Sequence, residues 1–340
     1  MVTLIGMGSG KWEALSAQAQ QAVRSAGLVF GAKRLLAGLP ADCTARQFAL
    51  YQPADILETL AQNPGQDAVV LYSGDTGFYS GASGLLTPLR ALGIPARVYP
   101  GVSSIQLLSA ALGRPWQDWK LVSAHGCACD PVAECMMNRS VFFLTGGTET
   151  PASLCQKLTD AGMGEAHGVV GENLGTEAEA IRYGSAAELA GQSFAPLSVL
   201  LVENFDLPQL RAPGFPDESF IRSEVPMTKQ EVRAAALAKL AVMPTDTLWD
   251  VGAGTGSVSV ELALAAPKGR VYAVECEPDA CELIRKNRAK FHACNLILIE
   301  GRAPDVLADL PAPDAVFIGG TKGGMEAVLD EVLGKNPNAR

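Results

Sequence analysis

The most informative stretch of this chain is Leu248-Trp-Asp-Val-Gly-Ala-Gly-Thr-Gly-Ser257. It has the pattern of a buried strand, a glycine turn and the start of a helix. Its three glycines, Gly252, Gly254 and Gly256, stand at every second position and let the backbone pass close to a ligand. A helix that begins near Ser257 directs free N–H groups toward the same place. The stretch therefore predicts a cofactor-binding corner.

A carboxylate ends the next predicted strand, Arg270-Val-Tyr-Ala-Val-Glu275. At this position in a parallel sheet, Glu275 is placed to accept hydrogen bonds from ribose hydroxyls. The glycine spacing is G-x-G-x-G, which differs from the G-x-G-x-x-G of the dinucleotide fingerprint. The two features together favour S-adenosylmethionine over NAD. An NAD-dependent dehydrogenase stays the less favoured alternative, and a tight strand-to-helix connection without a ligand is the plainest one.

Length and composition limit the class of protein. The chain has 340 residues, enough for two domains with separate cores, and none of its apolar runs is long enough to span a bilayer. The net charge of −9 argues against nucleic acid as a partner. The amino terminus, Met1-Val-Thr-Leu-Ile-Gly6, leads directly into a strand without a basic leader, so we expect a cytoplasmic protein with no membrane partner.

The cysteines do not predict a metal site. All eight are expected to be reduced thiols in the cytoplasm. A single cluster, His125-Gly-Cys127-Ala-Cys129 with Cys135 close behind, resembles a set of metal ligands, but its spacing matches no standard zinc pattern and it lacks a second pair. We therefore expect a surface loop with incidental thiols.

The first half of the chain repeats the order strand, glycine loop, helix. An apolar strand closed by alternating glycines covers Thr3–Gly10, and the buried strand Ala68–Tyr72 opens into Ser73-Gly-Asp-Thr-Gly77. A third strand, Ala96–Tyr99, leads into Pro100-Gly-Val-Ser-Ser104 and a helix. In open α/β sheets, ligands bind at such carboxyl ends of strands. Further strands are predicted over Lys120–Ala124, Ser140–Thr145, His167–Asn173 and Leu197–Glu203.

A change of composition separates the two halves. Four prolines fall among charged and small residues with no apolar period between Phe205 and Pro226, and we interpret 206–226 as an interdomain linker. A helix is then predicted from Met227 to about Leu240, with Thr228 as its N-cap and a glutamate three residues later completing a capping box.

Two more strands follow the glycine corner, Leu296–Glu300 and Ala315–Gly320, and a last helix covers about 324–333. Only four strands are therefore visible in the region 227–340. A methyltransferase sheet of this kind normally has seven. We accordingly expect this domain to be incomplete, truncated after its fourth strand.

Eight short motifs follow one another along the chain. They are Gly6-Met-Gly-Ser-Gly10, Ser73-Gly-Asp75, Pro100-Gly-Val-Ser-Ser104, Glu172-Asn-Leu-Gly-Thr176, Met227-Thr-Lys-Gln-Glu-Val-Arg233, Asp250-Val-Gly-Ala-Gly-Thr-Gly256, Glu300-Gly-Arg-Ala-Pro304 and Asp314-Ala-Val-Phe-Ile-Gly-Gly320. Through these motifs the chain resembles, over essentially its whole length, the precorrin-6Y C5,15-methyltransferases (decarboxylating) of cobalamin biosynthesis. Residues 1–205 are similar to the tetrapyrrole (class III) methyltransferases and 227–340 to a class I methyltransferase. The resemblance implies an α/β chain in which a two-lobed tetrapyrrole-methylase fold precedes a Rossmann-like class I fold.

The resemblance also implies an activity. Two S-adenosylmethionine sites would serve one small-molecule substrate, a precorrin-6 type macrocycle. The first domain would methylate C5, and the second would methylate C15 and decarboxylate the C12 acetate. Homo-oligomers are implied as well. Two alternatives stay open: a single-activity C5 methyltransferase with a non-catalytic carboxy-terminal remnant that binds S-adenosylmethionine, and a regulatory or scaffold protein that binds the cofactor without catalysis.

The resemblance assigns candidate residues to each site. Two proton acceptors are expected in the first domain, His125 and Glu172. In the second domain Arg233, with Lys229 one helical turn away, is placed to bind carboxylates of the macrocycle. The chain departs from its relatives at Cys127, where they usually have arginine. Cofactor contacts are expected at Gly74, Asp75, Ser103, Ser104 and Leu144 in the first domain and at Thr228, Gly252, Gly254, Gly256, Glu275 and Ala303 in the second.

Overall fold

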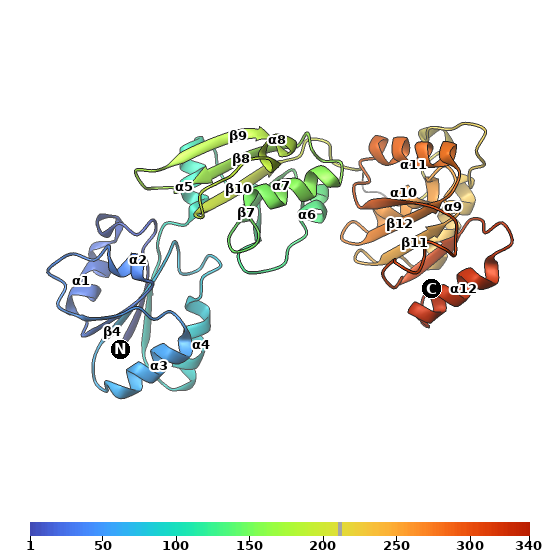
Figure 1. The fold of residues 1–340 in the computed structure, drawn as a ribbon. Coiled ribbons are helices and arrows are strands. Elements are labelled where there is room, and N and C mark those ends of the chain that lie inside the picture. Colours follow the sequence, from blue (N-terminus) through green and yellow to red (C-terminus); the bar gives the residue numbers. More distant parts are fainter. Residues whose placement is uncertain (210–212) are drawn as a thin grey trace. The chain divides into compact units, whose positions relative to one another are not determined.

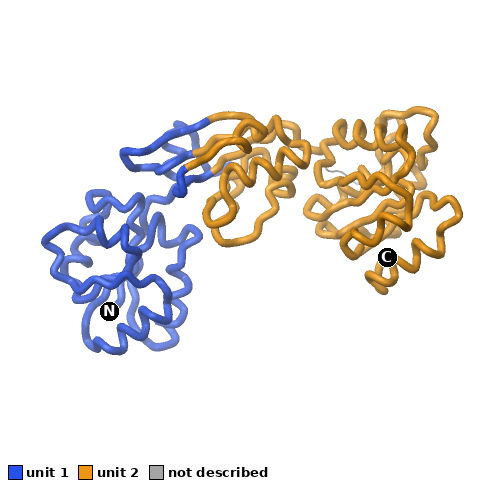
Figure 2. The backbone as a smooth tube through the Cα atoms, viewed as in Figure 1, with its two compact units in different colours: residues 1–118, 171–182, 195–199 blue, residues 119–170, 183–194, 200–340 orange. Residues whose placement is uncertain are grey.

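The computed structural model describes residues 1–209 and 213–340, which form three β-sheets with helices packed around them (Figure 1). These residues divide into two compact units (Figure 2). Residues 1–118, 171–182 and 195–199 make the first unit, and the other described residues make the second. The predicted α/β fold class is confirmed. Within the described ranges, none of the helices combines the length and apolar character that crossing a bilayer requires.

The first sheet is parallel, and its three central strands are buried on both faces. Alternate residues of β1 point to opposite sides, so Leu4 joins one apolar cluster and Ile5 the other. This two-sided burial explains the unbroken apolar runs in the sequence. In spatial order the strands are β3 (Arg46–Phe48), β2 (Leu28–Phe30), β4 (Ala68–Tyr72), β1 (Val2–Gly6) and β5 (Ala96–Tyr99). The helices of this region are α1 (Ala17–Ser25), α2 (Lys33–Leu36), α3 (Pro53–Gln62), α4 (Ala82–Ala91) and α5 (Ser104–Leu112).

The second sheet contains four predicted strands and one that the sequence did not predict. The unpredicted strand, β9, is six residues long and mostly exposed, so it lacks an apolar run. The strand order is β6 (Lys120–Ser123), β7 (Ser140–Leu144), β10 (Ser198–Glu203), β8 (His167–Glu172) and β9 (Ala180–Ser185). The accompanying helices are α6 (Pro131–Met137), α7 (Pro151–Asp160) and α8 (Ala186–Ala190).

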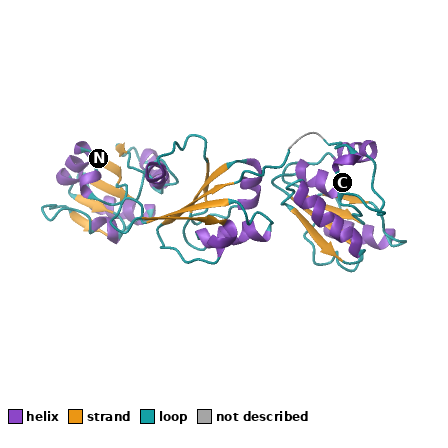
Figure 3. Cartoon of the chain, turned by 90° about the horizontal axis from the view of Figure 1, so that it is seen from above, coloured by secondary structure: helices purple, strands orange, loops and turns teal. Residues whose placement is uncertain are grey.

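The third sheet is parallel, with helices on both faces (Figure 3). Leu248 of its central strand packs toward α10 and α11, whereas Trp249 packs toward α12. The strand order is β13 (Leu296–Glu300), β12 (Arg270–Glu275), β11 (Thr247–Val251) and β14 (Ala315–Ile318). The helices are α9 (Gln230–Leu240), α10 (Ser257–Ala265), α11 (Pro278–Lys290) and α12 (Met325–Lys335).

Part of the predicted linker belongs to the core around this third sheet. Residues 210–212 lie outside the described residues, but Phe215 and Phe220 are 5% and 4% exposed and pack on Phe291 at the end of α11. The proline-rich composition concealed these two buried aromatic side chains. We expected a linker over 206–226, but the second half of this range packs into the core around the third sheet.

Arg233 holds this segment against α10. Its guanidinium is fully buried, with Nε 2.9 Å from Glu261 Oε1 and Nη1 2.8 Å from Asp217 Oδ1. Glu261 also accepts the backbone N–H groups of Gly214, at 2.6 Å, and Phe215, at 3.1 Å. The expectation that Arg233 faces the substrate therefore differs from its position. The reason is that α9 turns this side chain inward toward two carboxylates.

Helix α9 begins later than expected. The structure places its N-cap at Lys229, without a side-chain cap, so Thr228 does not cap the helix through a capping box. Instead, the carbonyl oxygen of Thr228 accepts a hydrogen bond from Nη1 of Arg233. The buried arginine thus satisfies a backbone group that precedes the helix.

A buried carboxylic acid lies beneath the glycine corner. Asp250 is 1% exposed on β11, and its Oδ2 accepts a hydrogen bond from the Ser259 hydroxyl. Its Oδ1 has no partner among the described residues. Burial raises the pKa of Asp250 from 3.8 to about 7. The folded chain therefore binds this proton more tightly than the unfolded chain does.

Replacing Arg233 by methionine is expected to lower the free energy of unfolding of the carboxy-terminal part by about 3–5 kcal/mol, because the buried Glu261 loses its cation. Urea unfolding of the full chain, followed by proteolysis of this part, measures the loss. The matched control is Lys229→Met, since Lys229 is exposed and lies 3.5 Å from the same Asp217. Equal effects of the two variants would contradict a structural role for the buried pair.

Replacing Asp250 by asparagine is expected to make the carboxy-terminal part less sensitive to pH. The raised pKa stabilises the fold below about pH 4, and this stabilisation is lost as the pH rises through 7. Between about pH 5 and pH 8 the free energy of unfolding of the native chain should fall by on the order of 3 kcal/mol relative to that of the variant. Each pH unit below the raised pKa accounts for ~1.4 kcal/mol, and the change ends near pH 7. Urea unfolding at the two pH values measures this. The exposed Asp279→Asn serves as control, and parallel behaviour of all three proteins would refute the prediction.

Candidate functional site

A cavity of about 510 Å³ opens where β11, β12, β13 and β14 end. This volume lies within the range of small-molecule sites. Loops that follow all four strands contribute to its wall, together with the segment before α9. The lining residues are Val225, Pro226, Met227, Thr228, Gly252, Ala253, Gly254, Thr255, Ser257, Val274, Glu275, Cys276, Glu277, Ala280, Gly301, Arg302, Ala303, Gly319, Gly320, Thr321 and Lys322.

The glycine loop after β11 is in close contact with the loop after β14. A Cβ atom on Gly252 would stand 2.3 Å from the carbonyl oxygen of Gly320, and Gly252 has a φ of 74°. Both observations require glycine at this position. Two N–H groups, of Gly319 at 2.8 Å and Gly320 at 3.3 Å, donate to the Val251 carbonyl oxygen. The floor of the cavity is therefore backbone, without side chains between the two loops.

Glu275 connects the glycine loop to the next strand end. It is 8% exposed, and its Oε2 accepts the N–H of Gly254 at 2.8 Å. Its Oε1 accepts the N–H groups of Cys276, at 2.7 Å, and Glu277, at 3.0 Å. A carboxylate has about four acceptor positions, so capacity for one hydroxyl of a ligand remains.

The structure brings together most of the residues predicted for the second site. Gly256 is not in the lining, because it caps α10 and lies against Ile284 of α11. Arg233 is also outside the lining. The predicted residues that do line the cavity are Thr228, Gly252, Gly254, Glu275 and Ala303.

Two cations in the lining were missed by the sequence reasoning. Arg302 follows β13 and Lys322 follows β14, and both are exposed. Lys322 forms an ion pair with Glu277, and its Nζ lies 3.8 Å from Cys276 Sγ. Their hydrogen bond lowers the pKa of Glu277 and raises the pKa of Lys322. The available signal was positional, because each residue comes directly after a predicted strand of the parallel sheet.

In the first unit, three predicted glycine loops meet at one edge of the sheet. The order β4-β1-β5 makes the carboxyl ends of these strands neighbours. A Cβ on Gly101 would lie 2.3 Å from the carbonyl oxygen of Gly74 and 2.5 Å from that of Gly6. Asp75 ties the loops together, since its Oδ1 accepts the Gly101 N–H at 3.0 Å and its Oδ2 the Gly77 N–H at 2.9 Å.

The other predicted residues of this unit have local structural partners. Ser103 is 3% exposed and caps α5 in a capping box with Gln106. Ser104, the first residue of that helix, is more accessible. Glu172, at the end of β8, accepts Arg182 Nε and the Ala195 N–H, both at 2.6 Å. Its carboxylate is thus anchored by two donors.

In the second unit, two predicted residues lie at neighbouring strand ends. His125 follows β6 and Leu144 ends β7, and these strands pair in parallel. His125 Nδ1 is 3.2 Å from the carbonyl oxygen of Thr145, and a Cβ on Gly146 would lie 1.8 Å from that nitrogen. Since a carbonyl oxygen only accepts, Nδ1 carries a proton and the neutral ring has an acceptor at Nε2.

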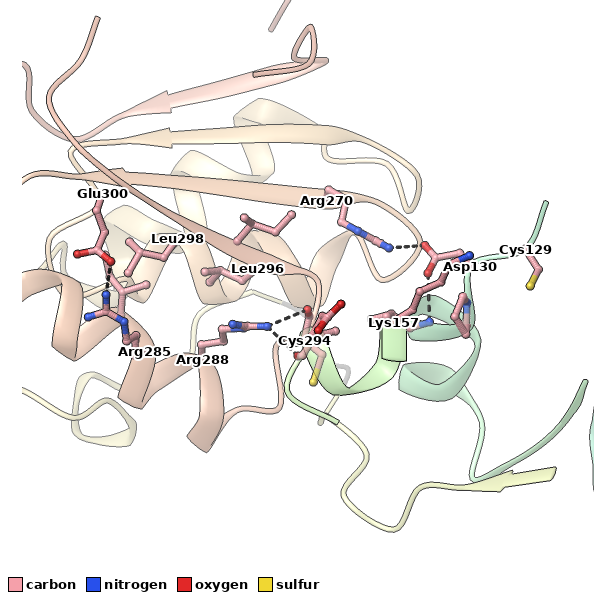
Figure 4. A pocket seen from close by; sticks show the side chains of 16 residues that line it. Cys129, Asp130, Lys157, Arg270, Arg285, Arg288, Cys294, Leu296, Leu298 and Glu300 are labelled. Atoms are coloured by element: carbon pink, nitrogen blue, oxygen red, sulfur yellow. Dashed lines mark hydrogen bonds and ion pairs between the residues drawn. The ribbon is translucent and has the colours of Figure 1, made fainter. Parts of the chain in front are cut away.

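A larger cavity of about 790 Å³ lies in the second unit beside α7 and β13 (Figure 4). It contains none of the predicted site residues. Its charged groups bind one another: Arg270 lies 2.7 Å from Asp130, and Arg285 pairs with Glu300. Arg288 donates to the carbonyl oxygen of Ala161 at 2.7 Å. These pairings leave the cavity without an evident ligand-binding group.

Two family models match this chain. The tetrapyrrole (corrin/porphyrin) methylases match residues 1–190, and the precorrin methyltransferase domain matches residues 219–339. A solved structure of a cobalt precorrin-4 methyltransferase has a TM-score of 0.51 and 17% identity, and covers 59% of this chain and 94% of that chain. This likeness shows the fold of the corresponding part.

Named relatives extend the comparison. A probable cobalt-precorrin-6B C(15)-methyltransferase (decarboxylating) of Sulfolobus acidocaldarius is 53% identical over 116 residues, 33% of this chain and 60% of the relative. A precorrin-6Y C(5,15)-methyltransferase [decarboxylating] of a Sinorhizobium species is 32% identical over 338 residues, 97% of this chain and 81% of the relative. With both parts matched in one relative, the chain belongs to the decarboxylating precorrin-6Y C5,15-methyltransferases, a family that uses S-adenosylmethionine.

Proposed function

We propose that this chain carries two S-adenosylmethionine sites that act on one precorrin-6 type macrocycle. The amino-terminal part methylates C5, and the carboxy-terminal part methylates C15 and removes the C12 acetate carboxyl group as CO₂. The observation that carries the proposal is the presence of two separate strand-end loop clusters in which a Cβ atom would collide with backbone, at Gly101 and at Gly252. The relatives named for both reactions, and those named for the C15 reaction alone, support the division of labour.

The size and the lining of the carboxy-terminal cavity support its assignment to the cofactor. Gly252 and Gly254 would approach its methionine end, Glu275 would accept a ribose hydroxyl, and Ala303 would contact the adenine. Thr228 lies in the same lining, at the segment before α9. The proposal assigns these residues to binding and orientation, and Gly256 to the start of the helix behind them.

The amino-terminal loops fit a second cofactor through their backbone. The loops after β1, β4 and β5 pack so closely that no side chain fits between them, and their backbone is exposed to a ligand only at the strand ends. Gly74 and Ser104 would contact the cofactor there, and the family resemblance adds Leu144 to the proposed contacts. Asp75 and Ser103 would act by holding the loops, since the structure gives them partners within the same segments.

The side chains mainly have to position the acceptor carbon. The cofactor supplies a methyl group that is already activated, so no nucleophilic side chain is required. His125 is the proposed proton acceptor of the first site, because Nδ1 is engaged with Thr145 and Nε2 is left to accept. Because Arg182 and Ala195 both donate to Glu172, its carboxylate is better suited to hold these segments together than to accept a proton.

The family resemblance also supports homo-oligomers, and the composition supports a cytoplasmic protein. We propose both for this chain. The net charge of −9 supports a small-molecule partner in place of nucleic acid.

Calorimetric titration of the full chain with S-adenosylhomocysteine is expected to show two sites. Gly252→Ala should remove one site, because its Cβ would collide with Gly320, and Gly101→Ala should remove the other by collision with Gly74. The double variant should bind none.

Two matched glycine variants serve as controls for this titration. A Cβ at Gly84 meets only ordinary contacts and one at Gly334 meets nothing, so both alanine variants should keep two sites. A native chain that binds at one site would indicate one working domain beside a crippled one and would contradict the proposal of two sites. Absence of binding would overturn it.

A further inference from the structure

Two cations lie on the rim of the carboxy-terminal cavity. Arg302 follows β13 and Lys322 follows β14, which are the two outer strands in the order β13-β12-β11-β14. The loops that carry the two cations approach each other beyond the sheet, since a Cβ on Gly324 would lie 3.9 Å from the carbonyl oxygen of Ala303. Both cations can therefore reach one ligand at the cavity mouth.

Arg302 is held at the rim by its backbone. The N–H of the preceding Gly301 donates to the carbonyl oxygen of Glu275 at 2.8 Å, and a Cβ on Gly301 would lie 2.3 Å from Val306 Cγ1. Within residues 1–209 and 213–340, the Arg302 guanidinium has no hydrogen bond or ion pair. A guanidinium in this state is suited to bind a carboxylate through two parallel hydrogen bonds.

Lys322 reaches across the cavity mouth. Because β11 lies between β12 and β14, the ion pair of Lys322 with Glu277 passes over the end of the glycine strand. The two side chains are 59% and 58% exposed. Exposed pairs of this kind contribute little to stability, so an incoming carboxylate can replace Glu277 at small cost.

The remaining charges of the lining leave the two cations as the groups that face an arriving anion. Glu275 is turned toward three backbone N–H groups. Glu277 is the partner that Lys322 would exchange. The lining therefore combines Glu275, where a cofactor ribose fits, with two cations that can bind an anion.

We propose that Arg302 and Lys322 form a two-point clamp for carboxylates on the periphery of the acceptor macrocycle, with Lys322 leaving Glu277 as the macrocycle binds. This inference rests on the proposed function. Both are positioning residues. The clamped carboxylates are different from the one that is lost, because a cation on the leaving carboxylate would stabilise the ground state relative to neutral CO₂ and slow its release.

The clamp is tested by binding of a corrin polycarboxylic acid and of the same corrin with its carboxylates converted to amides. Equilibrium dialysis in the presence of S-adenosylhomocysteine gives both affinities. Arg302→Met and Lys322→Met should each weaken binding of the acid about two- to fivefold and leave binding of the amide unchanged. Arg222→Met, an exposed arginine outside the lining, should change neither.

The Glu277→Gln variant shows whether Glu277 competes with the substrate for Lys322 or only holds Lys322 in place. When Glu277 competes with the substrate for Lys322, the variant binds the acid about two- to fivefold more tightly, and Lys322→Met abolishes this gain. Weaker binding of the acid by Glu277→Gln would overturn the exchange of partners.

Steady-state kinetics separates the clamp from the proposed function. Arg302→Met should raise KM for the macrocycle with kcat and the ratio of methylated to decarboxylated product unchanged, as expected for uniform binding. If S-adenosylhomocysteine still binds but neither cation affects the acid, the clamp is refuted and the proposed function stands. If S-adenosylhomocysteine does not bind, the proposed function itself fails.

Discussion

The carboxy-terminal site depends on the backbone contact between Gly252 and Gly320. Parallel pairing of β11 with β14 brings the two strand ends together, and the absence of a Cβ at Gly252 lets the following loops touch. The first sheet uses the same constraint, where Gly101 lies against Gly74 and Gly6. In both places, parallel strands bring the loops together, and glycine removes the side chains that would otherwise occupy the space.

These loops were predictable from the sequence because strand, glycine loop and helix follow one another within a few residues. Contacts between distant segments were not. Phe215 and Phe220 stand in a proline-rich stretch without an apolar period, yet they complete the core next to Phe291. Arg233 had the pattern of an exposed helical cation, and only the folded chain shows Glu261 and Asp217 around it.

The candidate site was predicted where residues follow a motif and was missed where side chains meet across the sheet edge. Glu275 was predicted from its place at the end of a strand and Ala303 from the family resemblance, and both line the cavity. Lys322 and Glu277 are 45 residues apart in sequence, and neither has a local signal for their ion pair. Such pairings depend on strand order, which a sequence without known topology leaves open.

The buried arginine also defines where the carboxy-terminal part begins as a folding unit. Phe215, Phe220 and Asp217 precede α9, but Arg233 and Glu261 bind them into the same core. A fragment cut at Met227 would lose three of these interior partners and expose the aromatic face of Phe291. A fragment that keeps the core of the carboxy-terminal part therefore has to include residues 213–226.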